Sequence, residues 1–177
     1  KVKEKLKNRC PKAKIKFIEM NGADYKHSEK NYFDLAMCIG GEWIFNGFKN
    51  TLSYLLQNVK QDGMIIAGCP FWQKEPSEEY LKTVELKKDN YGTHYENMLI
   101  GKELGLELIY SIVSSKDDWD NYEGLNWYAS FKYINANPFD KDNQELYNRI
   151  IKQQDSYLKW GRETIGWAIY IFQKVKI

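Results

Sequence analysis

The sequence predicts an α/β fold in which helices pack on both faces of a mostly parallel sheet. Two apolar runs, residues 35–39 and 64–69, are bounded by glycines, and the segment between them, 48–59, carries leucines at helical spacing. Neither run alternates polar with apolar residues, which is expected of strands buried on both faces. We therefore predict a strand, a crossover helix and a second, parallel strand, with the usual right-handed crossover.

The composition indicates a single domain, residues 1–177. The chain has 177 residues, 43% of them hydrophobic, and a net charge of +2 from 26 basic and 24 acidic residues. This balance gives no electrostatic case for nucleic acid or a membrane surface as a partner. No apolar run approaches the roughly 20 residues of a membrane helix. Three dispersed cysteines do not make a disulfide framework, so we expect a cytoplasmic protein.

Four elements are expected before the first of these strands. Lys1–Lys12 is predicted to be a short basic helix that ends at a proline. Residues 14–20 are predicted to form a strand, and residues 21–24, which begin with Asn-Gly, a turn. Residues 25–31 form a polar spacer with the character of a helical turn. Because the chain opens inside a helix without a cap, we expect it to be the later part of a longer protein.

The middle of the chain alternates helices with one further strand. The charged segment 77–88 is predicted to be a lid or an inserted helical turn. Residues 94–104 have an apolar side and are predicted to form a helix that ends at Gly105. Residues 106–113 are rich in β-branched and aromatic side chains, which predicts a strand.

The end of the chain is predicted to contain two long helices and a last strand. The acids that open segment 117–136 suit the start of a helix, and Pro138 follows its end. Residues 143–160 have one apolar stripe, and 165–175 alternate as a strand does. The last two strands are about 50 residues apart, which exceeds what a crossover needs. We expect this surplus to form a helical cap around residues 115–160.

Three stretches, in this order and spacing, resemble class I S-adenosylmethionine-dependent methyltransferases of the small-molecule type. Phe33–Gly41 resembles the fourth strand of that family, 55–70 the next helix, turn and fifth strand, and 162–170 the last strand. The resemblance runs from Lys1 to the C-terminus but does not cover the whole family domain. It implies a doubly wound, Rossmann-like sheet with strand order 3-2-1-4-5-7-6, a late antiparallel strand, and methyl transfer from S-adenosylmethionine to a small molecule.

Two parts of the family pattern are missing from this chain. The family holds its cofactor with a glycine-rich loop after the first strand and an acid after the second, and neither occurs here. Residues 14–20 would then be the third strand and 33–39 the fourth, with two absent strands between them. Without those strands, the backbone groups of residues 14–20 would be unpaired. Either the native protein has a further N-terminal region, which we favour, or strands pair across a homodimer. In the first case this fragment alone is expected to be inactive.

The cofactor is expected in the crevice at the carboxyl ends of the strands. By resemblance, the stretch Asn21–Asp24 contacts the adenine of the cofactor. The stretch Cys38–Gly41 lines the methionine part, where glycines let the backbone approach a ligand closely. The first stretch has an ordinary Asn-Gly turn as its alternative, and the second a strand-to-helix turn. The expected cofactor residues are Asn21, Gly22, Ala23, Asp24, Cys38, Ile39, Gly40 and Gly41.

Two residues are candidates for a catalytic role. Glu42 could orient a substrate amine or act as a base. His94 is a candidate general base, although a histidine that opens a helix and bonds to backbone is the favoured alternative. The acids of residues 117–123 do not have the spacing of a calcium loop, so no metal site is predicted.

Aromatic side chains are the candidates for a substrate wall. Those after the 64–69 strand could hold a cationic amine by cation–π contact, or form a hydrophobic plug. Those in the 117–136 helix share one face, with acids at the rim, which suits a cationic or hydroxylated substrate; the alternative is that they pack inward. The candidates are Trp43, Phe71, Trp72, Trp119, Tyr122 and Trp127.

Two other classes of function remain open from the sequence. One is a non-catalytic binding or partner module that keeps the fold but has lost the cofactor loop. The other is a different doubly wound nucleotide enzyme, such as a dehydrogenase, although the dinucleotide fingerprint is absent.

Overall fold

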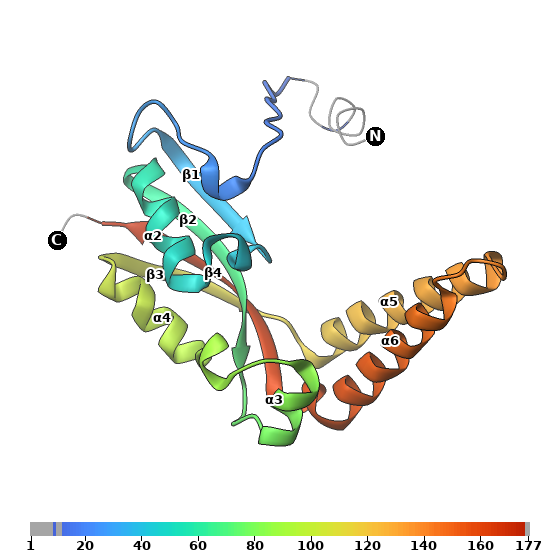
Figure 1. The fold of residues 1–177 in the computed structure, drawn as a ribbon. Coiled ribbons are helices and arrows are strands. Elements are labelled where there is room, and N and C mark those ends of the chain that lie inside the picture. Colours follow the sequence, from blue (N-terminus) through green and yellow to red (C-terminus); the bar gives the residue numbers. More distant parts are fainter. Residues whose placement is uncertain (1–8, 10–11, 176–177) are drawn as a thin grey trace.

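The computed structural model describes residue 9 and residues 12–175 (Figure 1). The strands are β1 (Phe33–Ile39), β2 (Val59–Trp72), β3 (Leu106–Val113) and β4 (Ile165–Lys174). The α-helices are α2 (Phe48–Asn58), α3 (Glu78–Val84), α4 (His94–Glu103), α5 (Lys116–Ala136), α6 (Asn143–Ser156) and α7 (Arg162–Thr164). Short helical turns are η1 (Gly22–Asp24), η2 (Glu42–Phe45), η3 (Lys88–Asn90) and the π-helical η4 (Tyr157–Gly161).

The four strands form one sheet in the order β1-β2-β4-β3. β1 and β2 are parallel, with Leu35 opposite Met64 and Ile39 opposite Gly68. β4 runs antiparallel to both of its neighbours. This confirms the predicted strand–helix–strand unit and the mostly parallel sheet with a late antiparallel strand. The order equals the 4-5-7-6 part of the expected arrangement.

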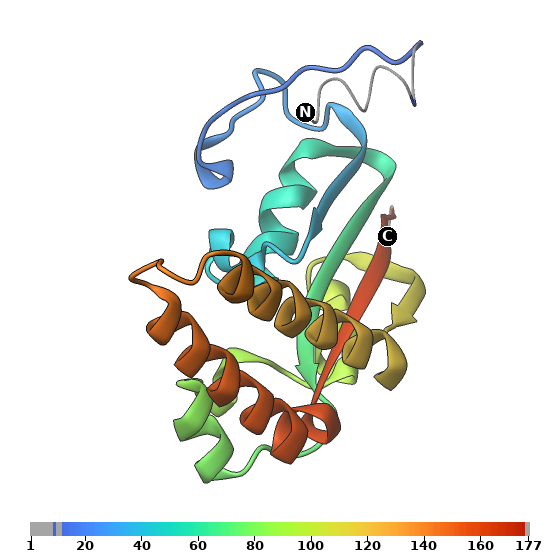
Figure 2. The ribbon, with the colours of Figure 1, turned by 90° about the vertical axis from the view of Figure 1, so that its right-hand side faces the viewer.

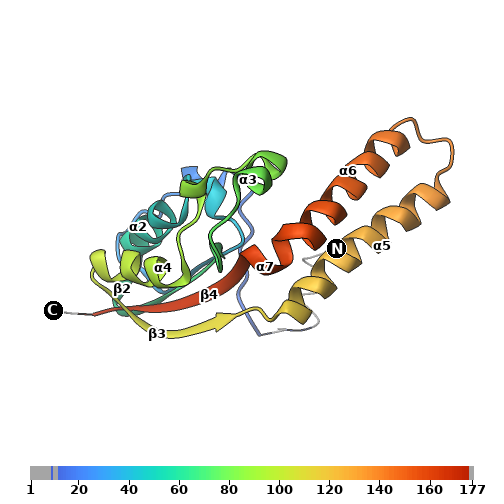
Figure 3. The same ribbon diagram turned by 90° about the horizontal axis from the view of Figure 1, so that it is seen from below.

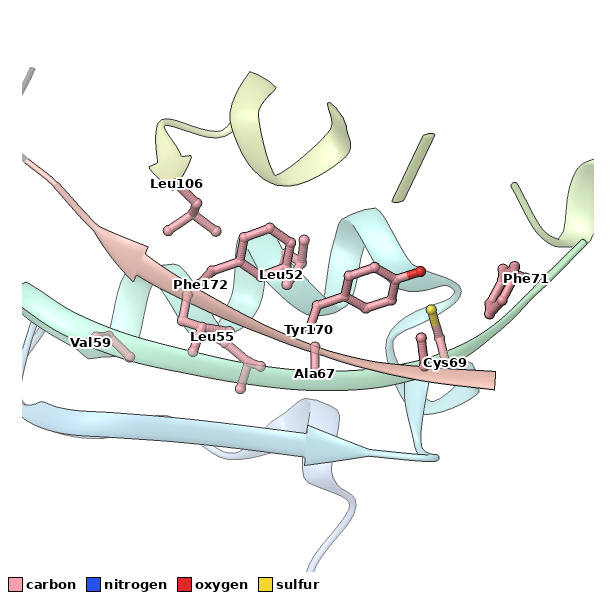
Figure 4. Close-up of a cluster of buried hydrophobic side chains, with 11 residues drawn as sticks. Leu52, Leu55, Val59, Ala67, Cys69, Phe71, Leu106, Tyr170 and Phe172 are labelled. Atoms are coloured by element: carbon pink, nitrogen blue, oxygen red, sulfur yellow. The ribbon is translucent and has the colours of Figure 1, made fainter. Parts of the chain in front are cut away.

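The core lies between the sheet and the helices α2 and α4 (Figure 4). Leu52 on α2 meets Ile65 of β2 and Tyr170 and Phe172 of β4, and all four side chains have 0% exposure. Burying a large apolar side chain contributes about 1.5–3 kcal/mol, so this layer fixes both helices on the sheet. α4 comes close because it has no side chain at Gly101, where a Cβ would collide with the ring of Phe172.

The opposite face of the sheet carries no helix in the described part of the chain (Figure 3). Its apolar side chains are open to solvent: Met37 is 58% exposed and Ile112 is 49% exposed. The prediction that the strands are buried on both faces is therefore wrong for the described residues. The uncovered face is formed by Leu35, Met37, Ile39, Met64, Tyr110 and Ile112, with Ile66, Ile169 and Ile171 between them.

Three local predictions in the first part of the chain, up to the start of β2, need correction. Residues 14–20 form no strand and are exposed. Residues 25–31 contain bends and no helical turn. The second strand begins at Val59 rather than at residue 64, and Gln61–Gly63 lies inside it, where Asp62 has a φ of 63° and the register with β1 shifts. The predicted helix at Lys1–Lys12 lies outside the described residues, apart from Arg9 and Lys12.

The last two long helices form an antiparallel hairpin that extends away from the sheet (Figures 1 and 3). α5 starts at a capping box made by Ser115 and Asp118. The predicted helix 143–160 is α-helical to Ser156 and continues through η4. α3 packs on the side of α6 near the sheet (Figure 2). No helix among the described residues has the length and apolar character to cross a membrane.

Candidate functional site

A cavity of about 490 Å³ lies at the carboxyl ends of β1 and β2, and we call it the strand-end cavity. Because these strands are parallel and paired, their carboxyl ends meet at one edge of the sheet. The start of α5 forms one side of it. It is lined by Ile39, Gly40, Glu42, Pro70, Ser114, Asp118, Trp119, Tyr122 and Trp167.

Gly40 takes the chain out of β1 and leaves its backbone open. Its φ is +67°, a conformation that glycine adopts at little cost, and its N–H donates to the carbonyl of Gly68 at 3.1 Å. A Cβ at Gly40 would have no atom within 4 Å. The residue therefore borders open space at the end of the strand, as expected where a backbone approaches a ligand.

Glu42 is the first residue of η2 and turns its carboxylate inward. Its Oε2 is buried and has no hydrogen-bond partner among the described residues. Glu42 also borders a second cavity of about 450 Å³, on the side of Cys69 and Tyr91. A buried oxygen without a partner costs about 1–3 kcal/mol, which a donor on a ligand would offset.

Two aromatic side chains of α5 form the wall opposite Glu42. The capping box fixes the first turn, because the Ser115 N–H and hydroxyl both donate to Asp118 Oδ2 at 2.8 Å. Trp119 and Tyr122 follow one turn apart, with ring centroids 5.9 Å apart in an edge-to-face arrangement. The Trp119 Nε1–H is buried without a partner in the described part of the chain. The wall thus offers aromatic surface to the cavity.

α5 is held in place by a charged contact that the sequence did not reveal. Arg162 donates from Nε to Asp120 Oδ1 at 2.9 Å and from Nη2 to Oδ2 at 2.8 Å. The Tyr157 hydroxyl donates to the same carboxylate at 2.7 Å. The Arg162 hydrogen bonds and then that of Tyr157 lower the pKa of Asp120, so it stays ionised. The contact joins α5 to the segment that leads into β4.

Other predicted substrate residues lie outside the strand-end cavity. Phe71 and Trp72 are 5% and 6% exposed; Phe71 packs on the ring of His94, and the Trp72 Nε1–H donates to the Lys88 carbonyl at 2.8 Å. This arrangement corresponds to the hydrophobic plug, the alternative that the sequence leaves open for these two residues. Trp127 packs on Tyr157 between α5 and the end of α6. Trp43 is 75% exposed and lines the second cavity.

His94 belongs to a buried polar network beneath the site. Its Nδ1 lies 2.8 Å from the Tyr170 hydroxyl, which also accepts from Asn97 Nδ2 at 3.1 Å. The tautomer of His94 sets whether the hydroxyl donates to Nδ1 or accepts from it. Burial lowers the pKa of His94 below its ordinary value of 6.5. This partner differs from the backbone partner expected from sequence, and His94 does not line the strand-end cavity.

The two stretches expected to hold a cofactor lie next to each other. Asn21 caps η1, its Oδ1 accepting from the Ala23 N–H at 3.1 Å. η1 packs against η2, where a Cβ at Gly22 would lie 3.5 Å from Ile44 Cγ2. Asp24 and its neighbours in η1 do not line the strand-end cavity, whereas Ile39 and Gly40 do. Cys38 is half-buried beneath the turn, 3.3 Å from a Cβ placed at Gly41.

Among the described residues, no group of three or more histidine, cysteine or acidic side chains could hold a metal ion.

The sheet order with its antiparallel β4, and the cavity at the strand ends, define a class I S-adenosylmethionine-dependent methyltransferase fold. No protein-family model matches the chain.

Solved structures similar to this chain include two S-adenosylmethionine-dependent methyltransferases, each in complex with S-adenosyl-L-homocysteine. The protein from Thiobacillus denitrificans is 27% identical, with 96% of this chain and 70% of that protein covered and a TM-score of 0.82. The protein from Geobacter sulfurreducens is 23% identical, with 89% and 63% covered and a TM-score of 0.80.

The chain is also similar to YjhP of Escherichia coli K12, an uncharacterized protein. The two are 26% identical over 159 residues, which make up 89% of this chain and 63% of YjhP. The X-ray structure of YjhP matches with a TM-score of 0.80. The chain thus spans less than two thirds of the length of YjhP and of the Geobacter protein.

Proposed function

We propose that the protein is a methyltransferase that uses S-adenosylmethionine as cofactor and methylates a small molecule. The observation that carries this proposal is the strand-end cavity beside the open backbone of Gly40. It lies in a fold shared with two methyltransferases that were crystallised with S-adenosyl-L-homocysteine.

The residues at the end of β1 fit such a cofactor. Gly40 has open space above its backbone, where a Cβ would have no atom within 4 Å. We propose that Cys38–Gly41 runs along the methionine part and that Asn21–Asp24, beside η2, contributes to the adenine end. The bound cofactor supplies an electrophilic methyl group. The chain's own residues then have to hold the acceptor in line and keep water out.

The size of the cavity favours a small acceptor. Its volume of about 490 Å³ falls in the range of small-molecule sites, roughly 300–1,000 Å³. Trp119 and Tyr122 supply the apolar wall that such sites use, and Glu42 a polar group that fixes orientation.

The proposal is tested by calorimetric titration of the natural-length protein with S-adenosyl-L-homocysteine. We expect a saturable heat of binding and a rise in the melting temperature. Gly40→Val should weaken binding about tenfold or more, because valine is strained at a φ of +67° and would fill the open space.

Gly105→Val is the matched control. Gly105 also has a positive φ, +73°, and open space around a Cβ, but it follows α4 and does not line the cavity. The strain is therefore similar and the ligand contact is absent. A wild-type protein that gives neither heat nor a melting shift would overturn the proposal, as would equal losses of affinity in both variants.

A further inference from the structure

The strand-end cavity has negative charge without a compensating positive charge. Glu42 and Asp118 are the charged residues among its described lining, which includes no lysine or arginine. The nearby cations are engaged elsewhere: Lys116 pairs with Glu163, and Arg162 binds Asp120 through hydrogen bonds of 2.8, 2.9 and 3.0 Å. Hydrogen bonds from Ser115 hold the pKa of Asp118 below its usual range, so this carboxylate also stays ionised.

Three aromatic rings surround the same space. Trp167 forms the floor, and its ring lies on β2, where a Cβ at Gly68 would be only 2.7 Å from Trp167 Cζ2. Trp119 and Tyr122 stand on α5 at the side, with their rings edge to face. The faces of indole and phenol rings carry negative potential and attract cations. Carboxylates and aromatic faces therefore favour the same kind of ligand.

Glu42 is the less engaged of the two carboxylates that line the cavity. Asp118 Oδ2 accepts two hydrogen bonds from Ser115 within the capping box, whereas Glu42 Oε2 has no partner among the described residues. A carboxylate at this place accepts hydrogen bonds from an ammonium group and repels an anionic ligand. The geometry thus distinguishes a cationic ligand from a neutral or acidic one.

We propose that the methyl acceptor is a small aliphatic amine that binds as its ammonium form between Glu42 and the rings of Trp119, Tyr122 and Trp167. This inference rests on the proposed methyltransferase function. The ammonium first gives a proton to the Glu42 carboxylate, which frees the nitrogen lone pair. The lone pair forms the new bond to the methyl carbon while the methyl–sulfur bond breaks, and that electron pair remains on the sulfur. Glu42 is then a catalytic residue, acting as base.

The cation site can be tested without knowing the amine. The natural-length protein, with and without saturating S-adenosyl-L-homocysteine, is titrated with tetramethylammonium and with the neutral analogue tert-butanol, and intrinsic tryptophan fluorescence is recorded. We expect tetramethylammonium to bind to the loaded protein about tenfold more tightly than tert-butanol. Glu42→Gln should remove most of this preference, and Trp119→Phe should reduce the fluorescence change, leaving the part that Trp167 contributes.

Two variants serve as controls. Glu107→Gln removes a carboxylate from an exposed position on β3, outside the cavity, and should leave the preference unchanged. Trp160→Phe removes an indole that packs on Tyr80, also outside the cavity, and should leave the fluorescence change in place.

The outcomes separate the two proposals. Binding of S-adenosyl-L-homocysteine without any preference for tetramethylammonium overturns the amine acceptor and leaves the methyltransferase proposal standing. Competition between the two ligands also overturns it, because the cavity would then hold the cofactor's own amino group. Absence of S-adenosyl-L-homocysteine binding overturns both.

Discussion

Arg162 and Asp120 are joined by paired hydrogen bonds, Nε to Oδ1 at 2.9 Å and Nη2 to Oδ2 at 2.8 Å. This fork-to-fork contact fixes direction as well as distance. Asp120 lies one position after Trp119 on α5, and Arg162 lies just before β4, which carries Trp167 into the cavity. The contact therefore sets the spacing between the wall and the floor of the strand-end cavity.

Loss of this contact should disturb the cavity more than the fold. Arg162→Lys keeps the charge but loses the planar fork, so α5 should be held less firmly. We expect a weaker response of tryptophan fluorescence to tetramethylammonium, together with a small fall in melting temperature because the pair is partly exposed. Lys152→Arg, in the ion pair with Glu85 far from the cavity, is the comparison and should change neither. A full response from Arg162→Lys would contradict the positioning role.

Gly101 should tolerate no larger residue. A Cβ there would collide with the ring of Phe172, which has 0% exposure, so α4 must shift. We expect Gly101→Ala to lower the free energy of unfolding by about 1–3 kcal/mol, measured by urea denaturation. Gly124→Ala is the matched control, since Gly124 is helical with nothing within 4 Å of a Cβ. It should raise stability by about 0.5–1 kcal/mol, and equal effects would refute the packing argument.

His94 should make stability depend on pH. Burial lowers the pKa of His94 in the folded state, so the unfolded chain takes up a proton first as pH falls through about 6.5. Its contribution is complete above that pH and is lost progressively as the pH decreases toward the folded pKa. The carboxylates with lowered pKa values, such as Asp118 and Asp120, affect the stability only at lower pH, where they become protonated.

The measurement is the free energy of unfolding between about pH 7.5 and pH 5. The wild-type protein should lose stability over this interval, and His94→Gln should show a flatter profile at lower overall stability, because the Tyr170 hydroxyl keeps only an amide partner. A profile of unchanged slope in the variant would rule out His94 as the source.

The elements with a local signal could be predicted from sequence. The alternation of Trp167, Ile169 and Ile171 identified β4, because period-two patterning reports a strand directly. The leucines of α2 and the apolar runs of β1 and β2 identified the parallel unit. The strand order came from the resemblance, since pairing of distant strands leaves little trace in local pattern.

Non-local contacts account for the predictions that were wrong. Lys14–Met20 alternates like a strand, but a strand forms only as part of a sheet, and these residues do not belong to the sheet of β1 to β4. The start of β2 was missed because Asp62 adopts a positive φ inside the strand. Here the side chain of Gln173, on β4, donates to the Asp62 carbonyl across 111 positions of sequence.

The candidate site was predicted in part for the same reason. Glu42, Trp119 and Tyr122 could be placed because strand ends and one helix face have regular positions. Phe71 and Trp72 follow a strand end too, but sequence does not say which face of the sheet they take, and they lie in the core. The partners of Asp120 and His94, 42 and 76 positions away, had no local signal.

The uncovered face of the sheet has a practical consequence for handling these residues. Met37, Tyr110 and Ile112 expose hydrophobic surface to water, and the outer edge of β1 has no strand beside it in the described chain. Unpaired edge strands and exposed hydrophobic patches promote aggregation. Expressed on their own, residues 1–177 should increase the fluorescence of hydrophobic dyes and aggregate at high concentration. Detergent, or a segment that covers this face, should reduce both the dye fluorescence and the aggregation.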